Sequence, residues 1–444
     1  MPHSFHSVKL ARDKCKGCTT CITTCPTEAI RVRNGKAVII EERCIDCGAC
    51  IRICPSHAKE AISDALEDIK KYDYKVAVPA PTLYGQFNMK ISIDKILTGL
   101  LALGFDEVFE AADAAEVVAA KTRQCLAEKN GDLPLISSSC PAIVRLIQLK
   151  YPGLLDQIIR VESPMETAAR IVKEELHPDK KSIGVFFISP CAAKVTAVRN
   201  PMGCKHSSVD GVIPIKDIYL PLMNAISEVE TMEHLGKASF RGISWAVSEG
   251  EGDNVGCHDI VAVDGIDQVA KVFEEIENRR FRNVDFIEAM ACPGGCVGGP
   301  LTVENPYIAK ARIRKKAQEA TDKEANENQN KAIASPGEFI PRETHVNMEW
   351  QEEVKPKQIM KLDEDFRKAV IKMEEMEAIE KSLPGLDCGS CGAPTCKALS
   401  EDIVRGYAVK NDCIFILKEE IQTLASNLAE LGARRPLSMD KEKK

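Results

Sequence analysis

Apolar runs alternate with helix-period stretches through the middle of the chain, between about residues 75 and 345. This alternation predicts an α/β domain, because short apolar runs are typical of buried strands and a 3.6-residue period is typical of helices. Each of four apolar runs ends at a cluster of Pro, Ser or Cys. Open α/β folds build their sites beyond the carboxyl ends of strands, so we expect the four loops to converge. The runs are 76–78, 133–136, 183–188 and 284–287.

Towards the C-terminus the apolar positions follow a stagger of three and four residues that predicts coiled-coil seams. Each seam covers only about two and a half heptads, so packing onto the chain's own domains and formation of a homodimer both remain open. Between 315 and 330 the chain is polar and is expected to be an exposed helix or loop. The first seam is Ile359, Leu362, Phe366, Ala369, Met373 and Met376, and the second is Leu417, Ile421, Leu424, Leu428 and Leu431.

The length of 444 residues favours several domains, because one domain usually has roughly 100 to 200 residues. We expect an N-terminal module at 1–74, the α/β domain at 75–345, a helical linker at 346–382 and a C-terminal domain at 383–444. The net charge of −7 offers no basic surface for nucleic acid. No apolar run reaches the roughly 18 residues of a membrane span, and no apolar signal-peptide core is present near the start. We therefore expect a cytoplasmic protein with neither nucleic acid nor membrane as a partner.

The 19 cysteines indicate metal ligation, since a long chain without an export signal is an unusual place for many disulfides. Sixteen of them fall into three groups with ligand-like spacing or context. The remaining three, Cys125, Cys204 and Cys257, are interpreted as ordinary buried thiols.

The first 75 residues carry the run CxxCxxCxxxCP twice, which is the signature of bacterial ferredoxins. Three closely spaced thiolates cap three irons of a cubane, and the fourth cysteine of each run reaches across to the other cluster. A pair of zinc sites is the alternative, but it does not explain the second CxxxCP run in register. Two adjacent cubanes are suited to passing single electrons to and from a deeper site. One 4Fe-4S cluster is expected on Cys15, Cys18, Cys21 and Cys54, and the other on Cys25, Cys44, Cys47 and Cys50.

Four further cysteines lie in three of the loops that follow the predicted strands: Cys140, Cys191, Cys292 and Cys296. One thiol from each of two loops and two thiols from the third would be enough for a third cubane. The glycines near Cys292 and Cys296 would let backbone approach bulky inorganic sulfide. From the spacing alone, separate structural cysteines remain an alternative.

These loops resemble the three signatures of the catalytic domain of iron-only (FeFe) hydrogenases, TSCCPxW, MPCxxKxxE and ExMxCxxGCxxGGG. They stand here at 137–143, 189–197 and 288–300, and the resemblance covers about residues 1–345. It implies a two-lobed α/β domain in which the four cysteines hold the cubane of an H-cluster. It also implies that Cys296 bridges to a two-iron subsite carrying carbonyl, cyanide and an azadithiolate bridge.

The resemblance further implies a reaction, the reversible cleavage of hydrogen into protons and electrons, and roles for neighbouring residues. Lys194 matches a lysine that donates a charge-assisted hydrogen bond to a cyanide. Ser163 matches a serine near the dithiolate, and Met290 matches a methionine that packs beside the two-iron unit. Four turn residues are expected to line the cofactor: Ala80, Pro81, Ser189 and Pro190.

The departures from the family pattern concern proton transfer. Ser139 stands where fast hydrogenases have a proton-relaying cysteine, and a hydroxyl titrates far above a thiol. A substitute route through Glu249, Glu251 or Asp253 is conceivable, but a flexible and solvated acidic loop is the favoured interpretation of 248–254. If the cofactor is present but the usual proton-transfer residues are missing, hydrogen turnover should be slow. This combination predicts that the protein belongs to the sensory branch of the family. The other changed positions are Val118, Ala119, Ile159, Ser189 and Ala197.

The C-terminal region carries CxxCxxxxC and one more cysteine, namely Cys388, Cys391, Cys396 and Cys413. The run resembles the small four-cysteine 4Fe-4S domain of corrinoid iron-sulfur proteins, over about residues 383–420. That resemblance implies a fourth 4Fe-4S cluster, whereas a zinc ion on four cysteines is the alternative.

Taken with the resemblance, the residues predict a protein whose partners are hydrogen and protons, a redox partner such as a ferredoxin or a signalling protein, and the maturation proteins that build the two-iron unit. Two alternatives stay open. One is an ordinary ferredoxin-coupled hydrogenase that uses Ser139 and water for protons. The other is an iron-sulfur assembly adaptor of the Narf-like kind, which lacks the two-iron subsite.

Overall fold

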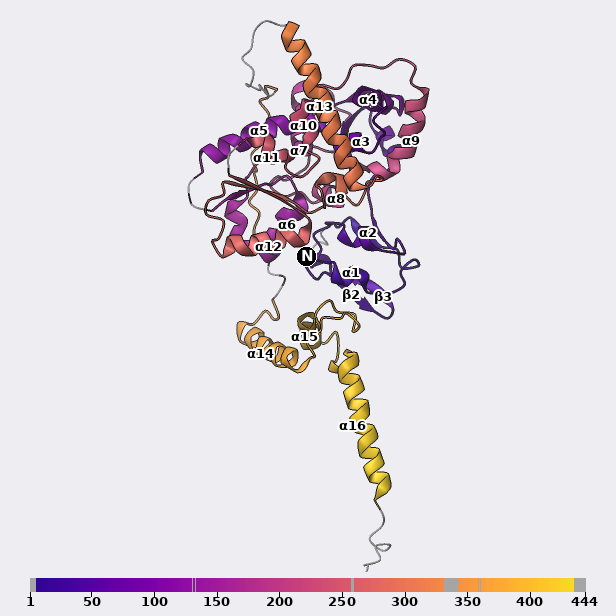
Figure 1. The fold of residues 1–444 in the computed structure, drawn as a ribbon, viewed down its shortest axis with the longest axis vertical. Coiled ribbons are helices and arrows are strands. Elements are labelled where there is room, and N and C mark those ends of the chain that lie inside the picture. The colour runs from indigo at the N-terminus through magenta and orange to yellow at the C-terminus, as the bar shows by residue number, and fades with distance from the viewer. Residues whose placement is uncertain are drawn as a thin grey trace, which may run out of the picture.

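The computed structural model describes residues 5–434, apart from 130, 132, 257–258, 331–341, 358 and 360 and the side chains of 323–330. Figure 1 shows a large α/β body, the N-terminal module against one side of it, and the C-terminal helices beyond that module. Among the described residues, no helix has both the length and the hydropathy needed to cross a membrane.

The N-terminal module is built twice from the same local structure. In each half a cysteine loop enters a short helix through a residue in the left-handed conformation, Thr19 (φ 63°) before α1 and Gly48 (φ 71°) before α2. The repeated cysteine run is therefore also a structural repeat. The helices are α1 (Thr20–Thr23) and α2 (Ala49–Ile53), and the antiparallel strand pairs are β1 (Val8–Leu10) with β4 (Lys59–Ala61) and β2 (Ile30–Arg33) with β3 (Lys36–Ile39).

Two parallel sheets form the two lobes of the α/β body. The four-stranded sheet has the order β6-β5-β8-β9, and the three-stranded sheet has the order β10-β11-β7. The residues of β8 and β11 are all buried, which explains the apolar run of β8 and places Glu288 of β11 inside the protein. The strands are β5 (Tyr74–Pro79), β6 (Glu107–Val108), β7 (Leu135–Ile136), β8 (Ile183–Ser189), β9 (Gly211–Pro214), β10 (Ile260–Asp264) and β11 (Phe286–Met290).

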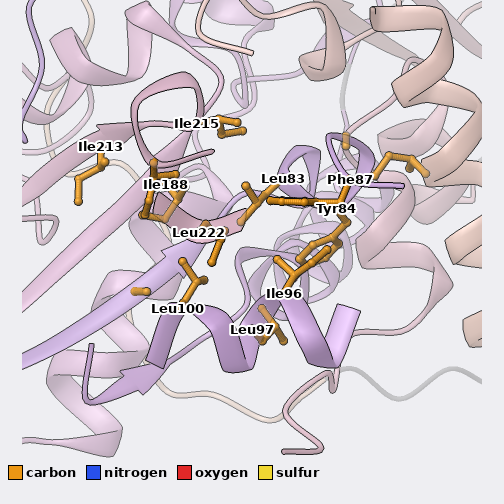
Figure 2. Packing of buried hydrophobic residues seen from close by; sticks show 14 of the residues in the cluster. Leu83, Tyr84, Phe87, Ile96, Leu97, Leu100, Ile188, Ile213, Ile215 and Leu222 are labelled. Atoms are coloured by element: carbon orange, nitrogen blue, oxygen red, sulfur yellow. The ribbon is translucent and has the colours of Figure 1, made fainter. Parts of the chain in front are cut away.

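Helices cover both sheets, as the predicted α/β class requires. Figure 2 shows part of the largest core, where Leu83, Tyr84 and Phe87 pack near Ile96 and Leu97. The helices are α3 (Thr82–Gly85), α4 (Ile93–Ala102), α5 (Ala111–Ala127), α6 (Pro141–Lys150), α7 (Pro164–Arg170), α8 (Ala192–Arg199), α9 (Ile215–Glu228), α10 (Phe240–Ser244), α11 (Gly250–Val255), α12 (Ile266–Glu277) and α13 (Pro306–Asn330). Shorter helical turns are η1 (Glu41–Arg43), η2 (Leu66–Lys71), η3 (Pro152–Gln157), η4 (Ile171–Leu176), η5 (Cys296–Gly298) and η6 (Lys410–Asp412).

The C-terminal region contains α14 (Phe366–Ser382), α15 (Cys396–Val404) and α16 (Ile414–Ala433). The first predicted seam is only partly helical, because α14 begins at Phe366 and leaves Ile359 and Leu362 outside it. The second seam lies on α16, which buries none of its residues and extends away from the rest of the chain (Figure 1). The expected polar helix at 315–330 is the second half of α13, although Lys316 is buried there.

Candidate active site and electron relay

The four loops predicted to converge do meet, around one cavity of about 70 Å³ between the two lobes. Each loop follows a strand: β5, β7, β8 or β11. Because all these strands are parallel within their sheets, the carboxyl ends of neighbouring strands lie at the same edge. The loops contribute Ala80 and Pro81, Ser139 and Cys140, Pro190 and Cys191, and Met290, Cys292 and Cys296 to the cavity lining.

The four thiols of this cavity lie close enough to influence one another. Burial raises the pKa of Cys191 to about 12 and that of Cys292 to about 11, and neighbouring thiols add to both shifts. Burial and the other three cysteines also raise the pKa of Cys296. Thiols with raised pKa values hold their protons, and a metal cluster is the kind of group that replaces those protons. The donor set therefore fits a 4Fe-4S cluster.

Two glycines allow the loops to approach closely around the cavity. A Cβ on Gly299 would lie 2.3 Å from the carbonyl oxygen of Pro190, and a Cβ on Gly295 would lie 2.6 Å from the backbone nitrogen of Ser248. Gly295 also has a φ of 95°, which side chains rarely adopt. Both glycines line the cavity, so its wall there is bare backbone.

Two donors on the cavity wall suit a ligand with hydrogen-bond acceptors. The side chain of Lys194 lines the cavity, and its positive charge lowers the pKa of Cys191 and Cys296. The hydroxyl of Thr82 also lines it, is buried, and has no hydrogen-bond partner among the described residues. Sequence reasoning missed Thr82, although its place directly after Ala80 and Pro81 was a usable signal.

Two predicted site residues lie outside the lining of this cavity. Ser163 lines a neighbouring cavity of about 50 Å³, together with Glu162, Lys194 and Cys204. The hydroxyl of Ser189 is used within its own loop, where it accepts a hydrogen bond from the Cys191 N–H at 3.0 Å. Met290, Pro190, Ala80 and Pro81 line the main cavity as expected.

The expectation of a flexible, solvated acidic loop at 248–254 is wrong for Glu251, whereas Glu249 and Asp253 are exposed as expected. Residues 250–255 form α11, and the side chain of Glu251 points into the protein, with 3% of the residue exposed. The Ser139 hydroxyl donates to Glu251 Oε1 at 3.2 Å, and the Ser137 hydroxyl lies 2.7 Å and 2.8 Å from the two oxygens of that carboxyl group. Glu251 also lines the main cavity. A buried acid thus stands directly behind Ser139.

A second buried acid lies beside the first. Glu288 accepts hydrogen bonds from the backbone N–H groups of Gly252 (2.8 Å) and Glu249 (2.9 Å). Burial raises the pKa of Glu251 to about 7, and burial followed by the charge of Glu251 raises the pKa of Glu288 to about 8. The carboxylate of Glu249 is 65% exposed and pairs with Arg314 at 3.3 Å, so this acid faces solvent.

The positions where the family pattern leads us to expect other relay residues are apolar in the structure. Val118, Ala119 and Ile159 belong to one buried hydrophobic cluster that also contains Trp245. Ala197 lines the neighbouring cavity beside Glu162. An apolar cluster offers no group that exchanges protons.

The N-terminal module contains two cavities of about 20 Å³ each. The structure brings together the same cysteines that the sequence groups. We call the cavity lined by Cys25, Cys44, Cys47 and Cys50 the inner cavity, and the one lined by Cys15, Cys18, Cys21 and Cys54 the outer cavity.

The inner cavity lies next to the active-site loops. The guanidinium of Arg52 lies 3.5 Å from Cys292 Sγ, and Cys47 is close enough to raise the pKa of Cys292. Gly48 has no room for a Cβ, which would lie 2.4 Å from Pro300 Cγ at the end of the third signature loop. Of the two cavities in the N-terminal module, the inner one therefore lies next to the active-site cysteines.

The C-terminal cysteines gather against the outer half of the module. Cys391, Cys396 and Cys413 share a small hydrophobic cluster, and Cys388 is close enough to raise the pKa of Cys391, which burial raises first. The Val32 N–H donates to the Gly392 carbonyl at 2.8 Å, and Arg33 Nη1 donates to the Cys391 carbonyl at 3.2 Å.

Buried ion pairs hold this contact. Arg31 Nε and Arg33 Nη2 lie 2.7 Å and 2.5 Å from Asp402 Oδ2, and Arg43 pairs with Glu401. The Arg31 and Asp402 side chains are 5% and 6% exposed. The C-terminal domain is thus anchored to the N-terminal module rather than to the α/β body.

Of the three cysteines outside the ligand-like groups, the structure describes two. Cys204 is buried, as expected, whereas Cys125 is half-buried. Cys257 lies outside the described residues.

A cavity walled by four thiols, joined to a chain of further thiol-lined sites, is the architecture of an iron-sulfur redox protein. Residues 73–250 and 221–300 match the model of the iron only hydrogenase large subunit, C-terminal domain; together they span 228 of the 444 residues. The chain therefore belongs to the iron-only hydrogenase family. Residues 7–55 match a 4Fe-4S dicluster domain, and residues 383–415 match an Fe-S cluster family.

Curated relatives agree with this family. Iron hydrogenase 1 of Clostridium pasteurianum is 26% identical over 386 residues, which cover 70% of this chain and 67% of that protein. The periplasmic Fe hydrogenase large subunit of Nitratidesulfovibrio vulgaris is 29% identical over 379 residues, which cover 70% of this chain and 90% of that protein. A cytosolic Fe-S cluster assembly factor, the NAR1 homolog of Schizosaccharomyces japonicus, matches 26% of this chain at 32% identity.

A solved structure of an FeFe-hydrogenase HydA1 variant from Chlamydomonas reinhardtii has a TM-score of 0.43 at 18% identity, covering 58% of this chain and 85% of that one.

Proposed function

We propose that this chain cleaves hydrogen reversibly at an H-cluster, that its turnover is slow, and that it serves as a hydrogen sensor in the cytoplasm. The observation that carries the proposal is the meeting of four thiols and Lys194 on one cavity. The reaction is H2 = 2H+ + 2e−, so the site needs one route for protons and another for electrons. The structure offers a candidate for each.

The cofactors we propose are four 4Fe-4S clusters and a two-iron subsite with carbonyl, cyanide and azadithiolate ligands. Cys140, Cys191, Cys292 and Cys296 would hold the cubane of the H-cluster, with Cys296 bridging to the two-iron unit. When bound, this group supplies the cleavage of hydrogen. Lys194 and Thr82 would orient it by donating hydrogen bonds to its cyanide acceptors.

For protons, we propose the route from Ser139 to Glu251 and then to Glu288. The Ser139 hydroxyl passes its proton to the Glu251 carboxylate, 3.2 Å away, as it accepts another from the cavity side. Acids with pKa values of about 7 and 8 exist in both protonation states near neutral pH, which is what a relay requires.

Slow turnover follows from the first member of this route. A serine hydroxyl is a far weaker acid than a cysteine thiol, so each proton transfer through Ser139 passes through a higher-energy state. The apolar cluster around Val118 and Ile159 offers no parallel path. Binding hydrogen without rapid consumption suits a protein that reports its presence.

For electrons, we propose the order active-site cubane, inner cubane, outer cubane and C-terminal cubane. Arg52 and Gly48 support the first step, and the contacts of Val32 and Arg33 with the C-terminal loop support the last. A redox or signalling partner would then exchange electrons at the C-terminal domain, while separate maturation proteins would build the two-iron unit.

We also propose a homodimer through α16. Its seam residues Ile421, Leu424 and Leu428 are 56%, 60% and 68% exposed. Side chains of this kind at alternating spacings of three and four residues are typical of a two-stranded coiled coil. Sedimentation of the unaltered chain and of Leu424→Glu tests this, and a monomer in both contradicts it.

Infrared spectroscopy of the anaerobically matured protein tests the central proposal. Bands of carbonyl and cyanide stretching are expected under argon, and hydrogen should shift them. No bands, despite full cubane loading and a maturation system that works on a known hydrogenase, would leave the assembly-adaptor alternative. Rapid hydrogen production by a protein that shows the bands would contradict the sensor role and favour an ordinary hydrogenase.

A further inference from the structure

The two halves of the N-terminal module differ at one buried position. Each half continues from its CxxxCP run through the same backbone path, which places Ile30 on the wall of the inner cavity and Lys59 on the wall of the outer cavity. Both are the fifth residue after the last cysteine of their run. The structural repeat thus pairs an apolar side chain with a charged one.

Lys59 is unusual for a lysine because it is 3% exposed. Its ammonium group has no hydrogen-bond partner among the residues that the structure describes. An apolar environment strongly disfavours a buried and unpaired ammonium, so a lysine at such a place calls for a compensating negative charge.

The cysteines of the module are the groups that this charge reaches. Lys59 lines the outer cavity together with Cys15, Cys18, Cys21 and Cys54. Cys21 belongs to the outer cavity and Cys50 to the inner one. Lys59 therefore lies in the lining of the outer cavity and not in that of the inner cavity.

The other cations near these cavities are differently placed. Arg145 is buried near Cys44 of the inner cavity, but its Nη1 lies 3.6 Å from Asp46 Oδ2 and its Nη2 donates to the Asn200 carbonyl at 2.9 Å. Lys16 lines the outer cavity but is exposed, and Arg52 is exposed beside the inner one, so water screens both charges. Lys36 is committed to a hydrogen bond from Nζ to the Cys15 carbonyl at 2.6 Å. Among the described residues around the outer cavity, Lys59 alone is both buried and unpartnered.

We propose that Lys59 is the buried counter-charge of the outer cubane and raises its reduction potential above that of the inner cubane. Reduction adds one negative charge to a cubane, and a nearby cation buried away from water favours the more negative state. Electrons from hydrogen would then move outward from the inner to the outer cubane. The inference rests on the proposed clusters of the N-terminal module and not on the two-iron subsite.

The test is a redox titration of the full-length protein with its cubanes loaded and no two-iron unit, followed by electron paramagnetic resonance. Lys59→Met removes the charge and keeps an unbranched side chain. At a fixed potential near the midpoint, the reduced-to-oxidised ratio of one cubane should fall at least tenfold, which for a one-electron couple corresponds to 59 mV. Ile30→Met, at the equivalent place of the other half, is the matched control and should shift no component.

The second part of the test adds a charge at the equivalent place in the other half of the module. Ile30→Lys should raise the potential of a different cubane component from the one lowered in Lys59→Met. Iron content is measured in every variant, so loss of a cluster is recognised as such. An unchanged titration of fully loaded Lys59→Met, or equal shifts in Lys59→Met and Ile30→Met, would overturn the inference. Neither result bears on hydrogen cleavage, which the infrared experiment tests separately.

Discussion

The proposed electron route and the proposed proton route from the active-site cavity are very different in construction. The electron route is a series of cysteine loops joined across three parts of the chain, and its last contact is held by Arg31, Arg33 and Asp402. The proton route is short and lies within the α/β body, where Ser139, Glu251 and Glu288 follow one another. The first depends on how whole domains dock, and the second depends on where a few side chains point.

This difference determines how each route can fail. A route made of docked domains is lost when the docking is lost, although every cluster can remain intact. A route made of single side chains is lost when one proton-exchanging group is removed, although the fold remains intact. The following predictions separate the two kinds of failure.

The largest effect is expected from Asp402→Asn. This change leaves Arg31 and Arg33 buried without their anion, and breaking a buried pair costs about 3 to 5 kcal/mol. The C-terminal domain should then separate from the N-terminal module about a thousandfold more often, by the rule of 1.4 kcal/mol for each tenfold change. Faster proteolysis within 383–395 and a weaker spin coupling between the outer and C-terminal cubanes measure the separation.

Glu364→Gln is the control for that variant, because its carboxylate is 94% exposed and pairs with Lys361 on the surface. It should leave both measurements unchanged. Unaltered protection of the C-terminal domain in Asp402→Asn would contradict the anchoring role of the ion pairs.

A smaller effect, about a hundredfold in turnover, is expected from Glu251→Gln, because the amide keeps a similar shape but exchanges no proton. The infrared bands should persist, which would show that the site still assembles. Glu249→Gln changes an exposed acid only two positions away and should have far less effect. Equal turnover of Glu251→Gln and the unaltered protein would remove Glu251 from the proton route.

The smallest effect concerns pH and stability. The pKa of Glu251 is raised to about 7 and that of Glu288 to about 8, so folding disfavours their ionised forms. Their contribution to stability is present at acidic pH and is lost as the pH rises through 7 and 8. The free energy of unfolding should fall by about 1 to 2 kcal/mol between pH 6 and pH 8, with a smaller fall in Glu251→Gln. Denaturant titrations at the two pH values test this, and a rise in stability towards pH 8 would contradict it.

The electron route was largely predictable because cysteine spacing is a local property. The CxxCxxCxxxCP runs place Cys54 with Cys15 and Cys25 with Cys44, and the structure brings these residues together. The convergence of the four strand-end loops was predictable as well, since it follows from parallel strand topology.

The proton route was not predictable in the same way. Three acids stand within five residues at 249–253, and nothing in their order distinguishes Glu251. What singles it out is the turn of α11, which aims one acid at Ser137 and Ser139 and leaves Glu249 facing solvent. The docking of the C-terminal domain could not be predicted from the sequence either, because Arg31 and Asp402 share no local pattern.

The pairing of Arg31 with Asp402 joins residues 371 positions apart. On the ribosome the N-terminal module emerges first, and its surface near Val32 has no cover until the last part of the chain has been made. Until then Val32 and Arg33 lack their contacts with the carbonyl groups of Gly392 and Cys391. The C-terminal domain therefore docks on a module that has already been synthesised.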